Sequence, residues 1–424
     1  MRKLKILVVS NTPWNSNNSF GNTYSNIFGD IEELEFANIY CRYGNVNEKK
    51  VVKSFQITEK TLIRNLKDKN IPSGSEINFN NDIKLAGIEK KAFDTVRKNR
   101  FRIFALLREL VWKIGRWQSY ELQNFIDDFN PDLIIQPVYY SSYINDIAMF
   151  CKKYTNKKML CYISDDCYTL KQINFSPIYW IERLWKRTKI KKTIDNCEIL
   201  YVISEIQKKE YEKIFKKNCK ILTKCEDFSE VAPTWEISQK TIKLMYAGNI
   251  SKGREKSLSY ISNAVERLNK EGYAVTFDIY TRSIINVNKL KKGTNYCGAV
   301  PYSEICRLQR EADIMVHVEG LSIRETLAIR QSFSTKLVDF FKLGKCIFAI
   351  GSKKQAFAKH LIDNKAAVVA ECEKDVYVKL KELLDNPEKI HSYGKKAYEC
   401  GKYHHSKEKI QAMLRDDLSK LIKE

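Results

Sequence analysis

Short apolar runs alternate with helical patterns along the chain, and this alternation constrains the fold more than any other feature. The runs include "KILVVS", "PDLIIQPV", "KKMLCYIS" and "CEILYVIS", then "IKLMYAG", "VTFDIYT", "ADIMVHVE", "CIFAIG" and "AAVVAE". Strands that alternate with helices pair in parallel, and they are apolar throughout because both faces of the sheet are covered. The sequence therefore predicts an α/β fold with parallel sheets.

One interruption of the pattern predicts two domains. We expect a Rossmann-like domain over residues 1–230, a linker over 231–243, and a second Rossmann-like domain over 244–400. The linker segment "VAPTWEISQKTIK" has little apolar pattern and contains Pro233. Residues 401–424 form a terminal helix with one apolar side, which could cross back to the first domain. Two such domains imply a ligand cleft at the carboxyl ends of their strands.

Composition narrows the class of protein. No apolar run approaches the roughly 20 residues of a membrane span, and the first residues lack a signal-peptide pattern. Twelve cysteines form no CxxC pair, and the five histidines all lie from His317 onward. These features favour reduced thiols in the cytoplasm and argue against zinc chemistry. The net charge of +22 predicts an anionic partner, with nucleic acid, anionic lipid and phosphorylated small molecules as candidates.

The segment "LMYAGNISKGREKSL" is the first candidate site. A predicted strand ends at Gly248, a loop follows, and a helix is expected from about Ser257. Lys252, Arg254 and Lys256 crowd the loop before this helix. Cationic side chains beside a helix amino terminus favour a diphosphate. The alternative is an ordinary basic loop in contact with solvent.

The segment "SFSTKLVDFFKLGKCIFAIGS" is the second candidate site. If a helix begins at "STK", its free N–H groups and the hydroxyls of Ser334 and Thr335 can hold phosphate oxygens. Asp339, one turn on, can accept hydrogen bonds from the vicinal hydroxyls of a ribose. Contacts for a phosphate and for ribose hydroxyls on one helix together predict a nucleotide-binding site. The alternative is a simple serine or threonine N-cap.

Three blocks of the second domain resemble a known family. "YAGNISKGREKSLSYISNA", "NYCGAVPYSEICRLQREADIMVHVE" and "FSTKLVDFFKLGKCIFAIG" are similar to the carboxyl-terminal domain of GT-B glycosyltransferases, and most of all to the retaining family-four type of bacterial surface polysaccharide biosynthesis. The resemblance covers about residues 242–351, whereas the first domain matches only in its rhythm of strands. It implies two Rossmann-like domains that face each other across a cleft and a nucleotide-sugar donor.

The resemblance also implies roles for individual residues. Arg254 and Lys256 would hold the departing diphosphate as catalytic cations. The donor site would include Gly21, Lys252, Gly298, Val300, Pro301, Glu319, Ser334, Thr335, Lys336 and Asp339. Gly298, Val300 and Pro301 would lie by the base, and Asp339 stands where the family has a ribose-binding glutamate. The chain departs from the family because it lacks the pair of glutamates seven residues apart.

A further departure concerns the first domain, which has no counterpart of the family's histidine. Its expected replacement is Asp165 or Asp166 in "YISDDCY", after a predicted strand. Adjacent carboxylates point in different directions, so at most one should face the transferred sugar. A structural turn aspartate is the alternative. Tyr139 and Tyr140 are expected to line the acceptor side.

Basic residues concentrate in two segments, 96–117 and 179–194, where they are interleaved with Trp, Phe, Leu and Ile. Basic amphipathic helices that carry tryptophan favour an anionic membrane surface. The alternative is a pair of packing helices with basic outer faces.

The prediction from the sequence is a glycosyltransferase without cofactor or metal, peripheral to the inner face of the cell membrane. It would move sugar from a nucleotide-sugar to a lipid-linked or growing glycan in capsule, exopolysaccharide or lipopolysaccharide biosynthesis, with no nucleic acid as partner. One rival is a nucleotide-sugar epimerase or hydrolase of the same fold. The other is a basic nucleic-acid binding protein, which would place its aromatic residues on a sheet or groove.

Overall fold

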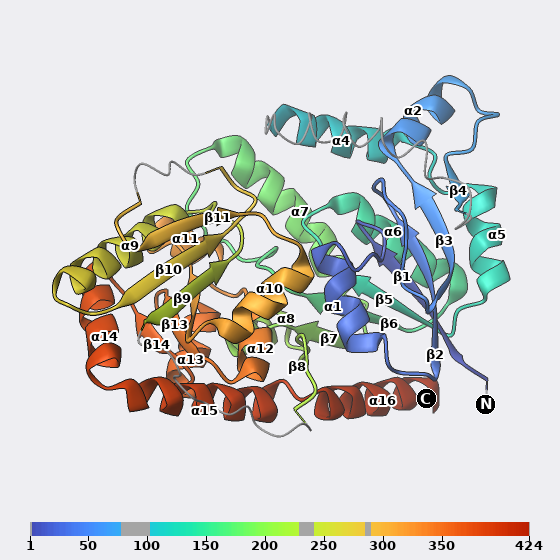
Figure 1. Cartoon of the computed structure of the whole chain (residues 1–424). Helices are drawn as coiled ribbons and strands as arrows, with labels where there is room; N and C mark the ends of the chain where they lie inside the picture. Colours follow the sequence, from blue (N-terminus) through green and yellow to red (C-terminus); the bar gives the residue numbers. More distant parts are fainter. Residues whose placement is uncertain (1, 78–101, 229–240, 285–289, 424) are drawn as a thin grey trace.

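The computed structural model describes residues 2–77, 102–228, 241–284 and 290–423 (Figure 1). The strands of the amino-terminal domain within these residues are β1 (Leu4–Ser10), β2 (Leu34–Tyr40), β3 (Val51–Ile57), β4 (Gly74–Glu76), β5 (Leu133–Pro137), β6 (Met159–Ile163), β7 (Ile199–Val202) and β8 (Cys219–Ile221). They form one sheet in the order β4-β3-β2-β1-β5-β6-β7-β8. Each neighbouring pair is parallel, except that β3 and β4 are antiparallel.

Helices cover both faces of this sheet because its strands are apolar on both sides. The described helices of the domain are α1 (Ser19–Phe28), α2 (Glu59–Lys67), α4 (Arg102–Ile114), α5 (Tyr120–Phe129), α6 (Ser142–Thr155), α7 (Pro177–Asp195) and α8 (Glu205–Phe215). In β1, Leu7 and Val9 pack into the core beneath α4 to α8, whereas Ile6 and Val8 pack on the opposite face with α1. Successive residues of a strand point to opposite faces, so one apolar run serves two cores.

The carboxyl-terminal domain repeats this architecture. Its described strands are β9 (Ile242–Ala247), β10 (Val275–Tyr280), β11 (Thr294–Gly298), β12 (Ile314–Val318), β13 (Cys346–Ile350) and β14 (Val368–Ala370), in the parallel order β11-β10-β9-β12-β13-β14. Its described helices are α9 (Arg254–Lys270), α10 (Tyr302–Glu311), α11 (Ile323–Ala328), α12 (Lys336–Leu343), α13 (Ala356–Asp363), α14 (Glu373–Asp385) and α15 (Pro387–His404). The predicted fold class, two Rossmann-like α/β domains, is confirmed.

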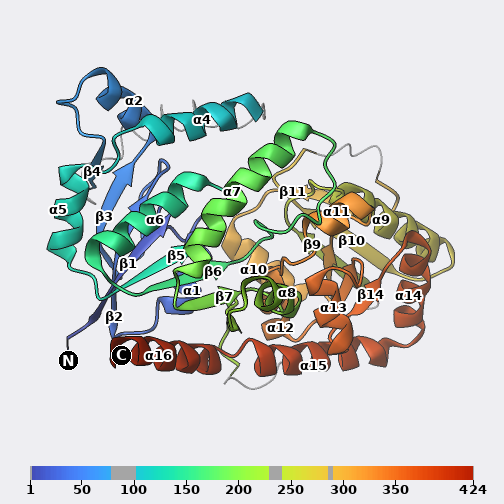
Figure 2. The same cartoon turned by 180° about the vertical axis from the view of Figure 1, so that it is seen from behind.

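The last helix, α16 (Lys407–Lys423), packs against the amino-terminal domain. Figures 1 and 2 show α15 under one lobe and α16 in line with it under the other. Ile410, Leu414 and Leu418 join the core beside α1, and the Tyr201 hydroxyl donates to Asp417 at 2.8 Å. The chain passes between the domains twice, once after β8 and once between α15 and α16. A backbone hydrogen bond joins these two segments, since Glu226 N–H donates to the His405 carbonyl at 2.9 Å.

Two boundaries differ from the sequence prediction. Strand β9 begins at Ile242, inside the range 231–243 expected as linker, and residues 229–240 lie outside the described residues. Helix α9 begins at Arg254, about one turn before the expected start near Ser257. No helix in the described part of the chain is both long and apolar enough to cross a membrane.

Candidate active site

The carboxyl ends of the two sheets face each other across a cleft of about 580 Å³. The loops after the amino-terminal strands supply Asn11, Arg42, Tyr139 and Asp165 to its walls. The loops after β9 and β12 and the start of α12 supply Lys252, Arg254, Glu319, Ser334, Thr335 and Lys336. The cleft thus lies where open α/β sheets bind ligands, as the pattern of the sequence predicts.

A tight turn places two cations at the carboxyl-terminal wall. Lys252 and Gly253 have φ of 62° and 81°, and Gly253 is the N-cap of α9. The positive φ of Gly253 favours glycine at this position, because side chains other than glycine are strained there. Arg254 follows at once and donates to Glu319 from Nε at 2.9 Å and from Nη2 at 2.6 Å. This bidentate pair fixes the guanidinium in the cleft.

The start of α12 forms the floor beside this turn. Thr335 is the N-cap, and its hydroxyl makes no capping hydrogen bond, whereas the N–H groups of Leu337 and Val338 already donate to the carbonyls of Ser334 and Thr335 at 3.1 Å and 3.2 Å. Lys336 donates from Nζ to the Ala247 carbonyl at 2.9 Å, which brings its ammonium to the end of β9. The segment "STK" therefore presents a hydroxyl, helix N–H groups and a cation to one cleft.

Electrostatics show that this wall favours an anion. Burial, then the charge of Arg254, lowers the pKa of Lys336. Burial, followed by the charges of Lys336 and Arg254, lowers the pKa of His317 beneath them to about 3. Two cations in a partly desolvated site repel each other, and a bound diphosphate would relieve that repulsion. The carboxylates of Glu319 and Asp339 offset part of this positive charge, since both act to raise the pKa of Lys336.

Asp165 and Asp166 face in opposite directions, as adjacent residues were expected to do. Asp165 lies on the cleft and accepts a hydrogen bond from the Ser332 hydroxyl across it at 2.7 Å. The Asp166 side chain is only 1% exposed and forms an ion pair with Arg183 at 3.2 Å. The prediction of a catalytic role for Asp166 is therefore corrected: this carboxylate folds the turn, because it also accepts from the backbone N–H groups of Tyr168 and Thr169.

The predicted acceptor tyrosines also separate. Tyr139 lines the cleft, whereas the ring of Tyr140 lies under the cations of Arg183 and Lys186, at 5.1 Å and 4.5 Å from its centroid. Tyr140 is not among the residues that line the cleft, so its expected acceptor role is corrected to a packing one. Gly21 lies in the first turn of α1, where its N–H donates to the N-cap Asn18 at 2.8 Å and a side chain would clash with the Asn15 backbone.

Several predicted donor residues lie outside the cleft lining. Lys256 is exposed on α9 and does not line the cleft, whereas Lys252 and Arg254 do, so the geometry favours these two over the predicted Lys256 as the cations for the diphosphate. Asp339 forms an ion pair with Lys224 of the amino-terminal domain. The pKa of Tyr302, at the start of α10, is raised by burial, then by a hydrogen bond with Cys306 and then by the charge of Asp339. The Asp339 carboxylate therefore lies near the start of α10.

The three residues expected by the base precede α10. Gly298 has φ of 70° and ends β11, and its carbonyl accepts from Thr281 N–H at 2.8 Å. Val300 and the exposed Pro301 follow. None of the three is among the residues that line the described cleft, but the effect of Asp339 on Tyr302 puts this loop next to α12. They lie at the edge of the site rather than in it.

Sequence reasoning missed a polar contact that joins the domains beside the cleft. Arg330, between α11 and α12, donates to both carboxylate oxygens of Glu210 on α8 at 2.6 Å. The Ser204 hydroxyl donates to the Gln331 carbonyl at 2.7 Å. Arg42, on the amino-terminal wall, was also missed. Single charges far apart in sequence give no local signal, so no motif could have identified them.

Comparison by sequence shows one family match. Residues 254–415, somewhat less than half of the chain, match the family described as "Glycosyl transferase-like". This range holds Arg254, Glu319 and the "STK" segment. No curated protein matches the chain by sequence.

Solved structures show the same fold over the whole chain. Sucrose-phosphate synthase from Thermosynechococcus elongatus is 11% identical, with 99% of each chain covered and a TM-score of 0.60. HepE from Anabaena, solved with UDP, is 9% identical over 98% of this chain and 100% of that one, with a TM-score of 0.62. A glycosyltransferase from Rickettsia africae is 12% identical, with 100% of both chains covered and a TM-score of 0.59.

These findings define the class of protein. The two domains have the GT-B fold, and the resemblance to GT-B glycosyltransferases predicted from the sequence is confirmed. Residues 254–415 of the chain match a glycosyltransferase-like family within this fold. The finer likeness to the retaining family-four type stays a prediction.

Proposed function

We propose that the enzyme transfers a sugar from a nucleoside diphosphate sugar bound in the cleft, with UDP as the nucleotide. The observation that carries this proposal is the convergence of Lys336, Arg254 and the start of α12 on one electropositive wall of the cleft. A diphosphate would accept from the helix N–H groups and from both cations. HepE, which shares the fold, has been solved with UDP, with UDP-glucose and with UDP and glucose.

In this proposal the cations of the carboxyl-terminal wall perform the main catalytic task. As the bond between sugar and diphosphate breaks, negative charge grows on the departing phosphate, and Arg254 and Lys336 stabilise it. Lys252 stands at the same turn and would close over the diphosphate. No cofactor or metal is required, because these fixed cations supply the charge that a metal would otherwise supply.

The amino-terminal wall would hold the acceptor. Asp165 faces the cleft from the opposite domain, where its carboxylate can orient the transferred sugar or the attacking hydroxyl. Tyr139 and Asn11 lie beside it. The acceptor we propose is a lipid-linked or growing glycan of capsule, exopolysaccharide or lipopolysaccharide biosynthesis, at the inner face of the cell membrane.

In this proposal Asp339 binds the ribose hydroxyls of the donor, as the resemblance implies. Lys224 now pairs with it, so the carboxylate would have to exchange that ion pair for two ribose hydroxyls. The base would lie by the loop that holds Gly298, Val300 and Pro301, as the resemblance to the family implies.

A thermal-shift panel tests the proposal. UDP, GDP, CMP and ADP are added to the protein at equal concentration, and a ligand at 100 times its Kd stabilises the folded state by about 2.7 kcal/mol. We expect UDP to raise the Tm most and uridine to have no effect. The matched variant is Arg254→Gln, which leaves the buried Glu319 without its partner and so lowers the Tm of the free protein. Its UDP shift is therefore measured from its own ligand-free Tm, and we expect that shift to be abolished. No stabilisation by any nucleoside diphosphate contradicts the proposal.

A further inference from the structure

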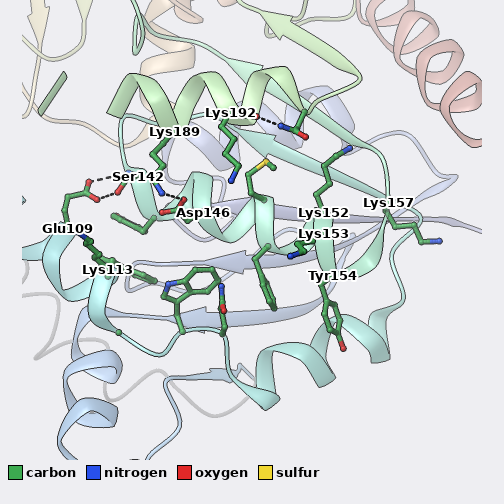
Figure 3. Close-up of a pocket in the computed structure, with 18 of the residues that line it drawn as sticks. Glu109, Lys113, Ser142, Asp146, Lys152, Lys153, Tyr154, Lys157, Lys189 and Lys192 are labelled. Atoms are coloured by element: carbon green, nitrogen blue, oxygen red, sulfur yellow. Dashed lines mark hydrogen bonds and ion pairs between the residues drawn. The ribbon is translucent and has the colours of Figure 1, made fainter. Parts of the chain in front are cut away.

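A second large cavity lies on the outer face of the amino-terminal domain, away from the cleft. It has a volume of about 1440 Å³ and shares no lining residue with the cleft. Its walls come from the end of α4, from α6 and from α7, with residues 156–158 at one end (Figure 3). We call this cavity the lysine groove. The cationic side chains that line it are Lys113, Arg116, Lys152, Lys153, Lys157, Lys158, Lys189 and Lys192.

The charge in the lysine groove is not neutralised within the protein. Its lining contains only three acidic residues, of which Glu198 and Asp146 pair with Lys152 and Lys189, each at 2.8 Å. The third, Glu109, pairs with the buried Lys186 behind the groove. Among the described residues, no ion-pair partner is found for the ammonium groups of Lys113, Lys153, Lys157 and Lys192 or for Arg116. The groove therefore holds an excess of cations ready for an anion.

Aromatic packing makes the groove a built surface rather than a loose cluster of side chains. The Trp117 ring meets Phe150 edge-on at 5.6 Å, and Phe150 stacks on Tyr154 at 5.7 Å. Trp112 stacks on Tyr143 at 4.3 Å with an interplanar angle of 7°. These rings fix the backbone of α4 and α6 from which the lysines project.

The two helices beside the groove expose apolar residues to solvent. On α7, Ile178, Ile181 and Leu184 are 52%, 69% and 52% exposed. In the first half of the same helix two charged side chains turn inward, because those of Arg183 and Lys186 are only 3% exposed. In the second half Ile190 and Ile194 pack into the core, so the exposed apolar residues gather at the first half of the helix.

Helix α4 repeats this exposure. Leu107, Leu110 and Ile114 lie on one side of the helix at spacings of three and four residues, and each is about half exposed. Figure 2 shows α4 and α7 on either side of α6. We call the exposed residues of α4 and α7 the apolar rims. Apolar residues gathered at one face of a soluble domain indicate an interaction surface.

We propose that this face docks on an anionic lipid bilayer, with the apolar rims in the interfacial layer and lipid phosphate headgroups in the lysine groove. Lysines attract anionic lipids, while leucine and isoleucine insert between acyl chains. A nucleic acid would satisfy the lysines but would leave both rims in water. This inference names the membrane surface that the proposed function needs, and it rests on residues separate from the donor site.

The position of α7 connects this face to the cleft. The inner side of α7 carries Arg183, which bonds the carboxylate and the carbonyl of Asp166, the residue after Asp165. The turn that carries Asp165 and Asp166 thus packs on the inner side of a helix, about 10 Å across, whose outer side carries an apolar rim. A glycan on a lipid anchor would have a short path from the bilayer to Asp165.

Vesicle binding of four proteins tests the inference. The groove variant carries Lys153→Gln, Lys157→Gln and Lys192→Gln. The rim variant carries Leu110→Ser and Ile181→Ser. The control variant, with the same loss of charge as the groove variant, carries Lys374→Gln, Lys395→Gln and Lys402→Gln on exposed positions of the other domain. Each protein is sedimented with vesicles of phosphatidylcholine alone or with 30% phosphatidylglycerol (about a third of the lipid, enough for a negative surface potential).

We expect the wild-type and control proteins to bind only the vesicles that contain phosphatidylglycerol, more weakly as salt rises. The groove variant should bind roughly 100-fold more weakly, since each lysine contributes about fivefold. The rim variant should also lose vesicle binding while its retention on heparin stays unchanged. The inference is overturned if the control variant loses as much vesicle binding as the groove variant. It is also overturned if the rim variant binds vesicles as strongly as the wild-type protein. The UDP thermal shift should persist in all four proteins, so failure here is distinguishable from failure of the donor site.

Discussion

Asp165 and Asp166 are adjacent, yet the structure predicts opposite effects for the same substitution. The Asp166 carboxylate accepts from the N–H groups of Tyr168 at 3.2 Å and Thr169 at 2.8 Å, and it pairs with Arg183 in a site that excludes water. Asp166→Asn removes the charge and leaves the guanidinium of Arg183 buried without its counterion. Breaking such a buried pair costs about 3–5 kcal/mol.

The same change at Asp165 should leave stability almost untouched. Asp165 is exposed in the cleft, and an asparagine there can still accept from the Ser332 hydroxyl. We expect the unfolding free energy to change by less than about 0.5 kcal/mol, while sugar transfer falls by roughly 100-fold or more.

Thermal unfolding followed by circular dichroism, together with transfer of radiolabelled sugar, measures both effects. Asp166→Asn should lower the Tm by roughly 10 °C, since each kcal/mol corresponds to about 2–4 °C for a domain of this size. Asp165→Asn should keep the Tm of the parent and lose activity. Equal Tm values for the two variants, or full activity in Asp165→Asn, would refute this assignment of roles.

Three further predictions concern binding, the domain contact and acid stability. Lys336→Met should weaken UDP binding about tenfold or more and leave uridine unaffected, as measured by calorimetry; equal effects on both ligands contradict a phosphate contact. Glu210→Ala leaves Arg330 partly buried without its bidentate partner, so the Tm should fall, whereas Lys171→Ala, on the exposed side of Glu210, should change it little. Burial first, then neighbouring histidines, lowers the pKa of His360 to about 4 and of His405 to about 3. In the unfolded state each histidine has a pKa of about 6.5, so below that pH the unfolded state binds more protons than the folded one. Each histidine should therefore destabilise the protein by about 1.4 kcal/mol per pH unit between 6.5 and its folded pKa. The urea midpoints of unfolding at pH 7 and pH 5.5 should differ less in His405→Gln than in the parent protein, and an equal difference contradicts the burial argument.

The fold could be predicted from the sequence because its signal is local. A strand such as "KILVVS" is apolar at consecutive positions since Ile6 and Leu7 pack on opposite faces of one sheet. The loops that follow such strands must lie at one edge of a parallel sheet, so the order of strands and loops alone was enough to place the residues after β9 and before α12 together.

The directions of single side chains could not be predicted in the same way. Which of Asp165 and Asp166 turns inward depends on Arg183, which is 17 residues further along the chain. The state of Asp339 depends on Lys224, 115 residues away and in the other domain. A local motif carries no information about partners that only the tertiary fold brings near.

The basic helices illustrate the same limit. The segment 179–194 shows cations and apolar residues at helical spacing, which fits both an apolar inner face and an apolar outer face. The structure decides between them, because Arg183 and Lys186 find Asp166 and Glu109 inside and leave Ile181 outside. Of the other segment, 96–117, residues 96–101 lie outside the described residues.

The central claim is that the donor diphosphate binds at the start of α12 between Lys336 and Arg254. A crystal structure of the protein with UDP tests it most directly. The account predicts both phosphates in the cleft, with oxygens within hydrogen-bond distance of Lys336 Nζ, the Arg254 guanidinium and the first N–H groups of α12. UDP bound with its phosphates in the lysine groove, or in the cleft without contact to either cation, would contradict it.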